Sequence, residues 1–360
     1  MLQLAVRAYN YVWFLTLSCY AISVPSGNTG KLDLSFLVPV DGLQHPVLLH
    51  MAKVLPFVVL QDKAPKIVNS YLHAFGAWKC WAEQCSVSVL PVEPVLFSLY
   101  LVKLIQENKS VSTINSALYG VSRVQKKVGH PQVTENPFVT QVADAAHRIL
   151  ARPPERKKPL TADQVLCIIS RLEKGSLADI QVAVIFAMGL LGFLRWDDLS
   201  NLAVDDLLFA DSHVALFLLQ HKNDQFREGS WVFIARSEAA PCPVVVLEKF
   251  LEMGSHSKGS RLFRRIQNTK RGQVLKEAPM SYSCASELVK KESKNEGLDP
   301  SLYSLHSLRS GGALSAAALE IPDCLFQRQG GWRSAQAKNN YIQESLDSLL
   351  LVTRKIHGSG

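Results

Sequence analysis

The segment LYSLHSLRSGGALSAAA (302–318) combines the start of a helix with two side chains that can bind an anion. Ser304 is of a type preferred at the N-terminal cap, which places His306 and Arg309 in the first turns of the helix, three residues apart on one face. A helix N-terminus already favours negative charge, so these two side chains predict an anion site there. The small residues that begin with Gly311 and Gly312 predict a closely packed neighbour.

A second arginine stands after an apolar helical stretch. Arg195 follows this stretch directly, and Asp198 lies one helical turn further on, where its carboxylate can hold the guanidinium. Lys222 lies in HKNDQFREG (221–229), between two strand-like runs. Taken alone, the Arg195–Asp198 spacing is also typical of a surface ion pair. Lys222 alone is also typical of a solvated lysine in a hairpin.

The last motif, GGWRSAQAKNNYIQ (330–343), places Trp332 after two glycines and Tyr341 nine residues later. Alone, either aromatic residue is also typical of a protein core. Together the four motifs read Arg…Lys…His-x-x-Arg…Trp…Tyr, and this order resembles the signature of the tyrosine recombinases, or phage-integrase family. The resemblance covers roughly residues 61–350, and HSLRSGGAL, GGWRS and NNY are most similar to recombinases of DIRS-type retrotransposons.

This resemblance implies a reaction on double-stranded DNA. Tyr341 would attack the scissile phosphodiester, leaving a 3′-phosphotyrosine and a free 5′-hydroxyl. Because the covalent link conserves the bond energy, no ATP, metal ion or other cofactor is expected. The resemblance also implies a homotetramer assembled on DNA, with two domains forming a clamp around each duplex.

Each remaining motif residue also acquires an implied role. Arg195 and Arg309 would bind the non-bridging oxygens of the transition state with forked donors. Trp332 would donate its indole N–H to the same phosphate, and His306 would hydrogen-bond it and assist proton transfer. Lys222 would protonate the departing 5′-oxygen as the general acid. Asp198, outside the catalytic set, would position the first arginine.

Other residues of the same types leave alternatives open. Lys249, Lys258 and Lys270 also lie between the Arg195 and His306 motifs, and any of them could be the acid. Two further tyrosines, Tyr282 and Tyr303, are expected in the core rather than at the reacting phosphate.

The composition of the chain favours a polyanionic partner. The chain has 360 residues, 48% apolar and 19% charged, which excludes a disordered chain or a membrane-embedded bundle. The 39 lysines and arginines exceed the 31 acidic residues, for a net charge of +8. The seven cysteines include no CxxC, so neither a disulfide framework nor a zinc site is indicated. The apolar run 182–194 is too short to cross a bilayer and predicts a buried core helix.

The predicted fold is mainly α, with two domains. Residues 61–151 show four helical patterns, at 66–85, 94–108, 112–127 and 137–150, and the resemblance implies a small all-α, SAM-like core-binding domain. In the first pattern the apolar residues from Val68 to Trp78 recur at three- and four-residue steps, predicting one buried face. Residues 61–160 contain 13 basic and 7 acidic side chains, which favours a nucleic-acid partner.

A basic linker is predicted at 152–160 (RPPERKKPL), since two prolines and clustered cations are unsuited to the interior of an element. The candidate DNA-binding residues are basic side chains in this linker and at the end of the third helix: Arg152, Arg156, Lys157, Lys158, Lys126 and Lys127.

Residues 161–356 form the predicted catalytic domain, mainly helical with one small β-sheet. Its first helix starts at TADQ (161–164), which resembles a capped helix start. Helices are expected at 162–173, 178–191, 241–253, 281–295, 304–319 and 323–328. Strands are expected at 213–220 and 230–236, paired as a hairpin.

Residues 1–60 are predicted to be an extension of uncertain structure. The stretch 11–24 has some likeness to the apolar part of a signal peptide, so a secretory leader at 1–24 is the alternative to the nuclear location that the resemblance implies.

Three other functions stay open. The chain could be a domesticated DNA-binding protein of the same fold that is catalytically silent, or a helical interaction scaffold without enzymatic activity. A topoisomerase would share the chemistry, and relaxation of supercoiled DNA by a monomer would reveal it.

Overall fold

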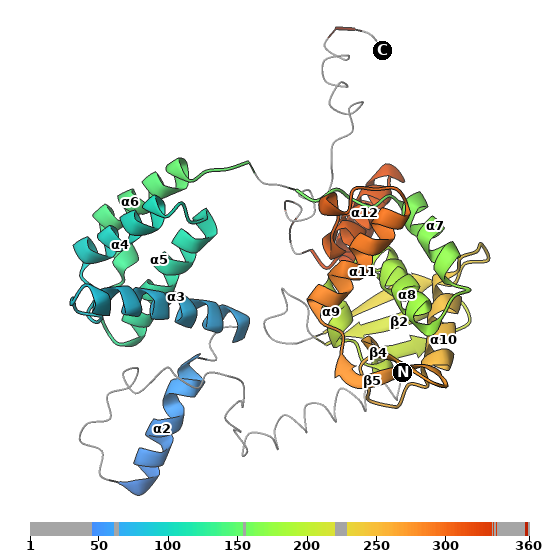
Figure 1. The fold of residues 1–360 in the computed structure, drawn as a ribbon, viewed down its shortest axis with the longest axis horizontal. Coiled ribbons are helices and arrows are strands. Elements are labelled where there is room, and N and C mark those ends of the chain that lie inside the picture. The colour runs from blue at the N-terminus through green and yellow to red at the C-terminus, as the bar shows by residue number, and fades with distance from the viewer. Residues whose placement is uncertain are drawn as a thin grey trace. The chain divides into compact units, whose positions relative to one another are not determined.

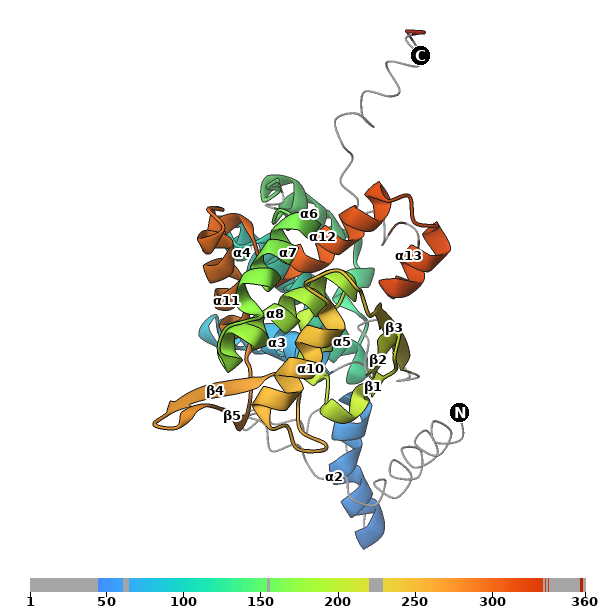
Figure 2. The same cartoon turned by 90° about the vertical axis from the view of Figure 1, so that its right-hand side faces the viewer.

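The computed structural model describes residues 45–60, 65–153, 156–219, 229–332, 334, 336, 357 and 358. The chain divides into two compact units, residues 1–153 and residues 154–360, and Figures 1 and 2 show their helices and strands in two views. Within the described ranges, no helix has both the length and the apolar character needed to cross a membrane.

The first described helix, α2 (Pro46–Leu60), falls in the stretch predicted to be an extension of uncertain structure. Its sequence is apolar almost throughout, and Val47, Met51 and Leu55 are exposed. A helix that is apolar all round has no alternation between faces, so no helical period marks it in the sequence.

The predicted helical set of the first unit is confirmed. Its helices are α3 (Pro65–Gln84), α4 (Pro94–Gln106), α5 (Val111–Lys127) and α6 (Pro137–Ile149), with a 3₁₀ turn η3 (Val133–Glu135). α3 packs on α5, and α4 packs on α6. The third helix begins one residue earlier than predicted, because Ser110 Oγ accepts the Thr113 N–H (3.2 Å) as the cap.

The core of this unit is built around Trp78, which is completely buried. Its ring meets Phe97 edge-on at 5.5 Å between centroids, and its indole N–H donates to the Val89 carbonyl at 3.1 Å. Phe75 is buried on the same face of α3, so the apolar face predicted from the helical spacing is confirmed.

The second unit contains more strands than the sequence predicted. Its helices are α7 (Ala162–Leu172), α8 (Leu177–Leu191), α9 (Trp196–Asn201), α10 (Pro243–Gly254), α11 (Tyr282–Asn295), α12 (Leu305–Ala318) and α13 (Asp323–Gln329), with 3₁₀ turns η4 (Val204–Asp206) and η5 (Pro300–Leu302). Its strands are β1 (Leu207–Phe209), β2 (His213–Leu218), β3 (Ser230–Ala235), β4 (Arg264–Thr269) and β5 (Gly272–Pro279).

These strands form two sheets where one was expected. The antiparallel sheet β1-β2-β3 contains the predicted pairing, with Leu218 opposite Ser230. The second sheet is the β4–β5 hairpin. Most of its side chains are exposed, so it lacks the apolar alternation by which strands are recognised in a sequence.

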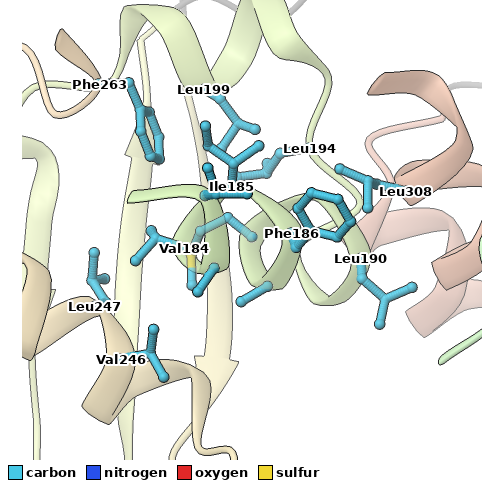
Figure 3. Packing of buried hydrophobic residues seen from close by; sticks show 14 of the residues in the cluster. Val184, Ile185, Phe186, Leu190, Leu194, Leu199, Val246, Leu247, Phe263 and Leu308 are labelled. Carbon is cyan, nitrogen blue, oxygen red and sulfur yellow. The ribbon is translucent and has the colours of Figure 1, made fainter. Parts of the chain in front are cut away.

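Helix α8 is the centre of the second unit, as the run 182–194 predicted. Ser176 and Asp179 cap its start, since the Ser176 N–H donates to Asp179 Oδ2 at 2.9 Å and the Asp179 N–H to Ser176 Oγ at 3.4 Å. Helices α7, α10 and α12 pack around it, and Figure 3 shows its side chains between Leu247 on one side and Leu308 on the other. It ends before Phe193, whose φ of 50° lies in the left-handed region.

The predicted linker needs one correction. Arg156, Lys157 and Lys158 are exposed, but the chain after them is hydrogen-bonded to the second unit. The Lys158 N–H donates to the Leu302 carbonyl (2.8 Å) and the Leu160 N–H to the Ser307 carbonyl (3.0 Å). Leu160 is fully buried, because an apolar side chain with its amide satisfied by α12 is more stable in the core than in water.

Candidate active site

Arg195 is held at the junction between α8 and α9. It occupies the cap position of α9 in an extended conformation, and its main-chain N–H donates to Asp198 Oδ2 at 2.9 Å. Its neighbours Leu194 and Trp196 are buried, whereas the side chain of Arg195 is half-buried. Asp198 therefore fixes the backbone from which this arginine extends, while its predicted contact with the guanidinium stays a prediction.

The start of α12 is capped as expected. Ser307 Oγ accepts the Ser304 N–H at 2.9 Å. The two candidate residues on this helix differ in exposure, since His306 is exposed in the first turn and Arg309 has only 1% of its surface exposed. The expectation that both share one face open to a ligand is wrong for Arg309, whose guanidinium points into the protein.

The Arg309 guanidinium joins three segments of the chain. Nη1 donates to the carbonyl of Phe193, two residues before Arg195, and Nη2 donates to the carbonyl of Gly330 at 2.6 Å. Its central carbon lies 4.4 Å from the centroid of the Trp332 ring. Three of the four motifs, those containing Arg195, Arg309 and Trp332, are thus brought together around one side chain.

Trp332 is buried, with 4% of its surface exposed, and packs in a small cluster with Phe193 and Phe326. The glycine pair before it has two uses. A Cβ on Gly330 would overlap the Trp332 ring, and Gly331 has a φ of 58°. These two requirements explain why both glycines precede the tryptophan.

The glycines of α12 also pack as predicted. A Cβ on Gly311 would overlap the Leu160 carbonyl oxygen, and one on Gly312 would overlap the Leu190 carbonyl oxygen. Close approach to the C-terminal end of α8 therefore depends on small residues, and it brings Arg309 within reach of Phe193.

Two proposed catalytic residues, Lys222 and Tyr341, lie outside the described residues. Their roles stay predictions. The described structure does show that the segment containing Lys222 connects the antiparallel strands β2 and β3.

The structure narrows the choice of general acid. Lys249 Nζ donates to the Glu173 carbonyl at 2.6 Å, just before α8 begins. Lys270 is in the β4–β5 turn, three residues from Gln273, whose side chain accepts the Ala178 N–H at the start of α8 (2.9 Å). Arg309 contacts the other end of α8, and a helix of 15 residues is about 22 Å long. Both lysines are therefore far from the arginine site, which leaves Lys222 and the exposed Lys258.

The two other tyrosines considered from the sequence differ in their exposure to solvent. Tyr303 is buried with 8% exposure, as expected. Tyr282 is 59% exposed at the first position of α11, so its predicted place in the core is wrong.

Several candidate DNA-binding residues have contacts within their own unit. Arg152 donates to Asn108 Oδ1 at 2.9 Å, and Lys157 Nζ donates to the Ser301 carbonyl at 2.7 Å. Lys126 is exposed and Lys127 half-buried in the last turn of α5.

Two groups in the arginine site were missed by the sequence reasoning. The carbonyls of Phe193 and Gly330 bind Arg309, yet a main-chain acceptor leaves no trace in residue type. The only signal was position, because each carbonyl lies two residues before a motif residue, Phe193 before Arg195 and Gly330 before Trp332. Among the described residues, no group of three or more His, Cys, Asp or Glu side chains could hold a metal ion.

No family model matches the sequence. The chain is 25% identical over 289 residues to an integrase/recombinase xerD homolog of Selenomonas ruminantium, covering 79% of this chain and 83% of that protein. Among solved structures, XerH site-specific recombinase bound to palindromic difH substrate, in a post-cleavage complex, is similar with a TM-score of 0.57, at 14% identity over 80% of this chain and 79% of that one. A lambda integrase tetramer bound to a Holliday junction is similar with a TM-score of 0.51, at 17% identity over 82% and 77%.

The fold is thus that of the DNA site-specific recombinases, and the mainly helical fold class is as predicted. The sequence match and the motif residues that meet around Arg309 confirm the resemblance to the tyrosine recombinases.

Proposed function

We propose that this protein breaks and rejoins double-stranded DNA in the site-specific recombination or integration of a mobile element, with Tyr341 as nucleophile. The observation that carries the proposal is the convergence on Arg309, which links the turn before Arg195 to the turn before Trp332. Such a link holds cationic donors in fixed positions, as stabilisation of a charged transition state requires.

In this mechanism the Tyr341 oxygen forms a bond to the phosphorus as the bond to the 5′-oxygen breaks, and His306 assists removal of the phenol proton. Arg195, extending from the fixed cap of α9, and His306, exposed at the start of α12, would bind the non-bridging oxygens. Arg309 would join them and Trp332 would add its N–H once DNA binding gives the phosphate access to these two buried side chains. Lys222 would give a proton to the leaving oxygen.

The finer assignments belong to the same proposal. The motif wording supports a DIRS-type retrotransposon recombinase, and a eukaryotic element would place the protein in the nucleus. The lambda integrase structure contains a tetramer on a Holliday junction, which supports four protomers on DNA here. The exposed basic residues Lys126, Arg152 and Arg156 support binding of the DNA backbone.

The test is formation of a covalent protein–DNA adduct on a nicked suicide substrate made from recovered element termini. The parent should form a protease-resistant adduct without added metal, and Tyr341→Phe should abolish it. Tyr282→Phe is the matched control, because it removes the hydroxyl of an exposed tyrosine outside the site and should leave the adduct yield unchanged. If Tyr341→Phe forms as much adduct as the parent, the nucleophile is another residue.

One observation favours the catalytically silent alternative. Arg309 is almost fully buried and both of its Nη atoms donate to main-chain carbonyls, an arrangement that stabilises the fold whether or not DNA is cleaved. Under this alternative the parent would bind the element termini and form no adduct. Binding that persists after Arg195→Ala, again without cleavage, would support it.

A further inference from the structure

The β4–β5 hairpin of the second unit is a two-stranded ribbon tied to α8 both at its base and close to its turn. The Arg264 carbonyl accepts from Gln181 Nε2 (2.8 Å), and Gln273 Oε1 accepts the Ala178 N–H (2.9 Å), so both strands are tied to α8. Ile266 and Leu275, which are paired in the register, pack against the core. Among the described residues, the ribbon therefore packs on the core through the face that contains these two side chains, and Figure 2 shows the two strands extending from the second unit.

Positive charge is concentrated in this short segment. Residues 261–279 contain six basic side chains and one acidic, a net of five charges in a chain whose total is +8. Two of the six basic side chains bind other side chains of the protein. Arg261 donates to Asn201 Oδ1 at 3.0 Å, and Arg264 is buried with Nη1 3.7 Å from Glu277 Oε1.

The remaining four cations, Arg265, Lys270, Arg271 and Lys276, are exposed. In the described part of the chain, the pair of Arg264 with Glu277 is the only ion pair of the hairpin, so none of the four has a carboxylate partner there. Lys276 lies two residues after Val274 on the outward face, and Lys270 and Arg271 form the turn. The cations thus extend along the free face and the tip.

We propose that this β4–β5 hairpin binds the phosphate backbone of duplex DNA, as a contact separate from the reacting site. The inference rests on the proposed function, since that function brings DNA to the second unit. Unpaired cations on a ribbon match a regular row of phosphates, and a two-stranded ribbon fits a major groove about 12 Å wide. The hairpin contains no aromatic residue, so it offers no stacking surface for single-stranded bases.

The contacted phosphates lie apart from the scissile one. The hairpin is tied to the first turns of α8, whereas Arg309 contacts the segment after its last turn. A helix of this length separates the two by about 22 Å. The hairpin therefore contributes to affinity and placement on DNA rather than to the chemical step.

The experiment uses the full chain and a labelled 40-base-pair duplex of arbitrary sequence, because the phosphate term of binding does not depend on sequence. The hairpin variant combines Arg265→Gln, Lys270→Gln, Arg271→Gln and Lys276→Gln. The control variant removes the same number of charges from α11 and from the turn after α7: Lys174→Gln, Lys290→Gln, Lys291→Gln and Lys294→Gln. Affinity is measured at several salt concentrations, and circular dichroism checks that both variants are folded.

Each phosphate contact contributes about 0.9 to the slope of log affinity against log salt, so the hairpin variant should lose up to about 3.6 from this slope. The control variant should change it by less than one such unit. A hairpin variant with the slope of the parent overturns the inference. If the slope is unchanged and the free variant also sediments differently from the parent, the inference is overturned and the hairpin is a protein interface instead. Failure of the recombinase proposal is a separate result, because it is read from the covalent adduct at Tyr341.

Discussion

The guanidinium carbon of Arg309 lies 4.4 Å from the centroid of the Trp332 ring, with both side chains almost completely buried. The indole face gives a partner to a charge removed from water, while the carbonyls of Phe193 and Gly330 accept its N–H groups. Because Phe193 lies two residues before Arg195, the same contacts fix the turn from which the other arginine extends. Two motifs that the sequence presents as separate are one packed unit.

Trp332→Ala should therefore affect both stability and activity. Removing this buried ring leaves a cavity beside a buried cation, and we expect the free energy of unfolding to fall by about 3–5 kcal/mol. Covalent adduct formation should fall with it, and Trp332→Phe, which keeps a ring over Arg309, should recover most of the stability. Chemical denaturation measures the first effect. Trp231→Ala is the control, because this residue is 37% exposed on β3 and its loss should cost about 1 kcal/mol or less. Equal losses in the two alanine variants would contradict the structural role of the Arg309–Trp332 contact.

Much of the fold follows from the sequence where helices have one apolar face or lie wholly in the core. The spacing from Val68 to Trp78 predicts the buried face of α3, and the run 182–194 predicts the buried α8. The β4–β5 hairpin could not be found in this way, since most of its side chains are exposed and leave both strands without a clear apolar alternation. Helix α2 was missed for the opposite reason, since it is apolar on all sides.

The candidate site was predictable as a set of residue types and not as a geometry. Residue order indicated the arginines, the histidine and Trp332, but the sequence does not say that Arg309 turns inward while His306, three residues before it, faces solvent. That difference depends on the carbonyls of Phe193 and Gly330. Because every residue has a main-chain carbonyl, residue type does not reveal which carbonyls will accept the Arg309 N–H groups. The sequence also left the lysines equivalent, whereas the contact of Lys249 with Glu173 separates it from the rest.

Two glycine-to-alanine substitutions should change the stability of the protein in opposite directions. Gly311→Ala should destabilise the second unit by about 1–3 kcal/mol, because its Cβ would overlap the Leu160 carbonyl and force α12 away from the start of α7. Gly76→Ala, in α3 of the first unit, places its Cβ in open space and should stabilise the helix by about 0.5–1 kcal/mol. Hydrogen exchange resolves the two units. A Gly311→Ala chain as stable as the parent would show that α12 does not depend on this close approach.

Stability should also depend on pH through His256. Burial lowers the pKa of this imidazole, and the nearby Arg264 adds to the effect, while Nε2 lies 3.2 Å from the Leu262 carbonyl. Below its ordinary value of about 6.5, the unfolded chain binds a proton at this position more readily than the folded chain. The contribution of His256 is therefore fully present above that value and is lost as the pH falls towards the lowered pKa of the folded state.

His256→Phe keeps a ring against Phe250, which lies 4.8 Å away between centroids, and removes the titrating group. The free energy of unfolding of this variant should fall less steeply than that of the parent as the pH is lowered below about 6.5. Denaturant titrations at several pH values measure this difference. His73→Phe, at an exposed position of α3, controls for the exchange of imidazole for phenyl. Identical pH profiles for the parent and His256→Phe would exclude this source of acid sensitivity.

The identity of the general acid can be tested through the leaving group. A substrate with sulfur in place of the bridging 5′-oxygen releases a thiolate, which needs no proton because a thiol has a pKa of about 8.5. Lys222→Ala should reduce adduct formation on ordinary DNA by about 10²–10⁴-fold and recover it on the sulfur substrate. Lys249→Ala should cleave both substrates at similar rates and lose about 1 kcal/mol of stability, since its ammonium binds the Glu173 carbonyl. Lys258→Ala is the decisive comparison, because this lysine is also compatible with the described geometry. If sulfur rescues Lys258→Ala and not Lys222→Ala, the acid comes from the loop before β4, and the β2–β3 connection has another role.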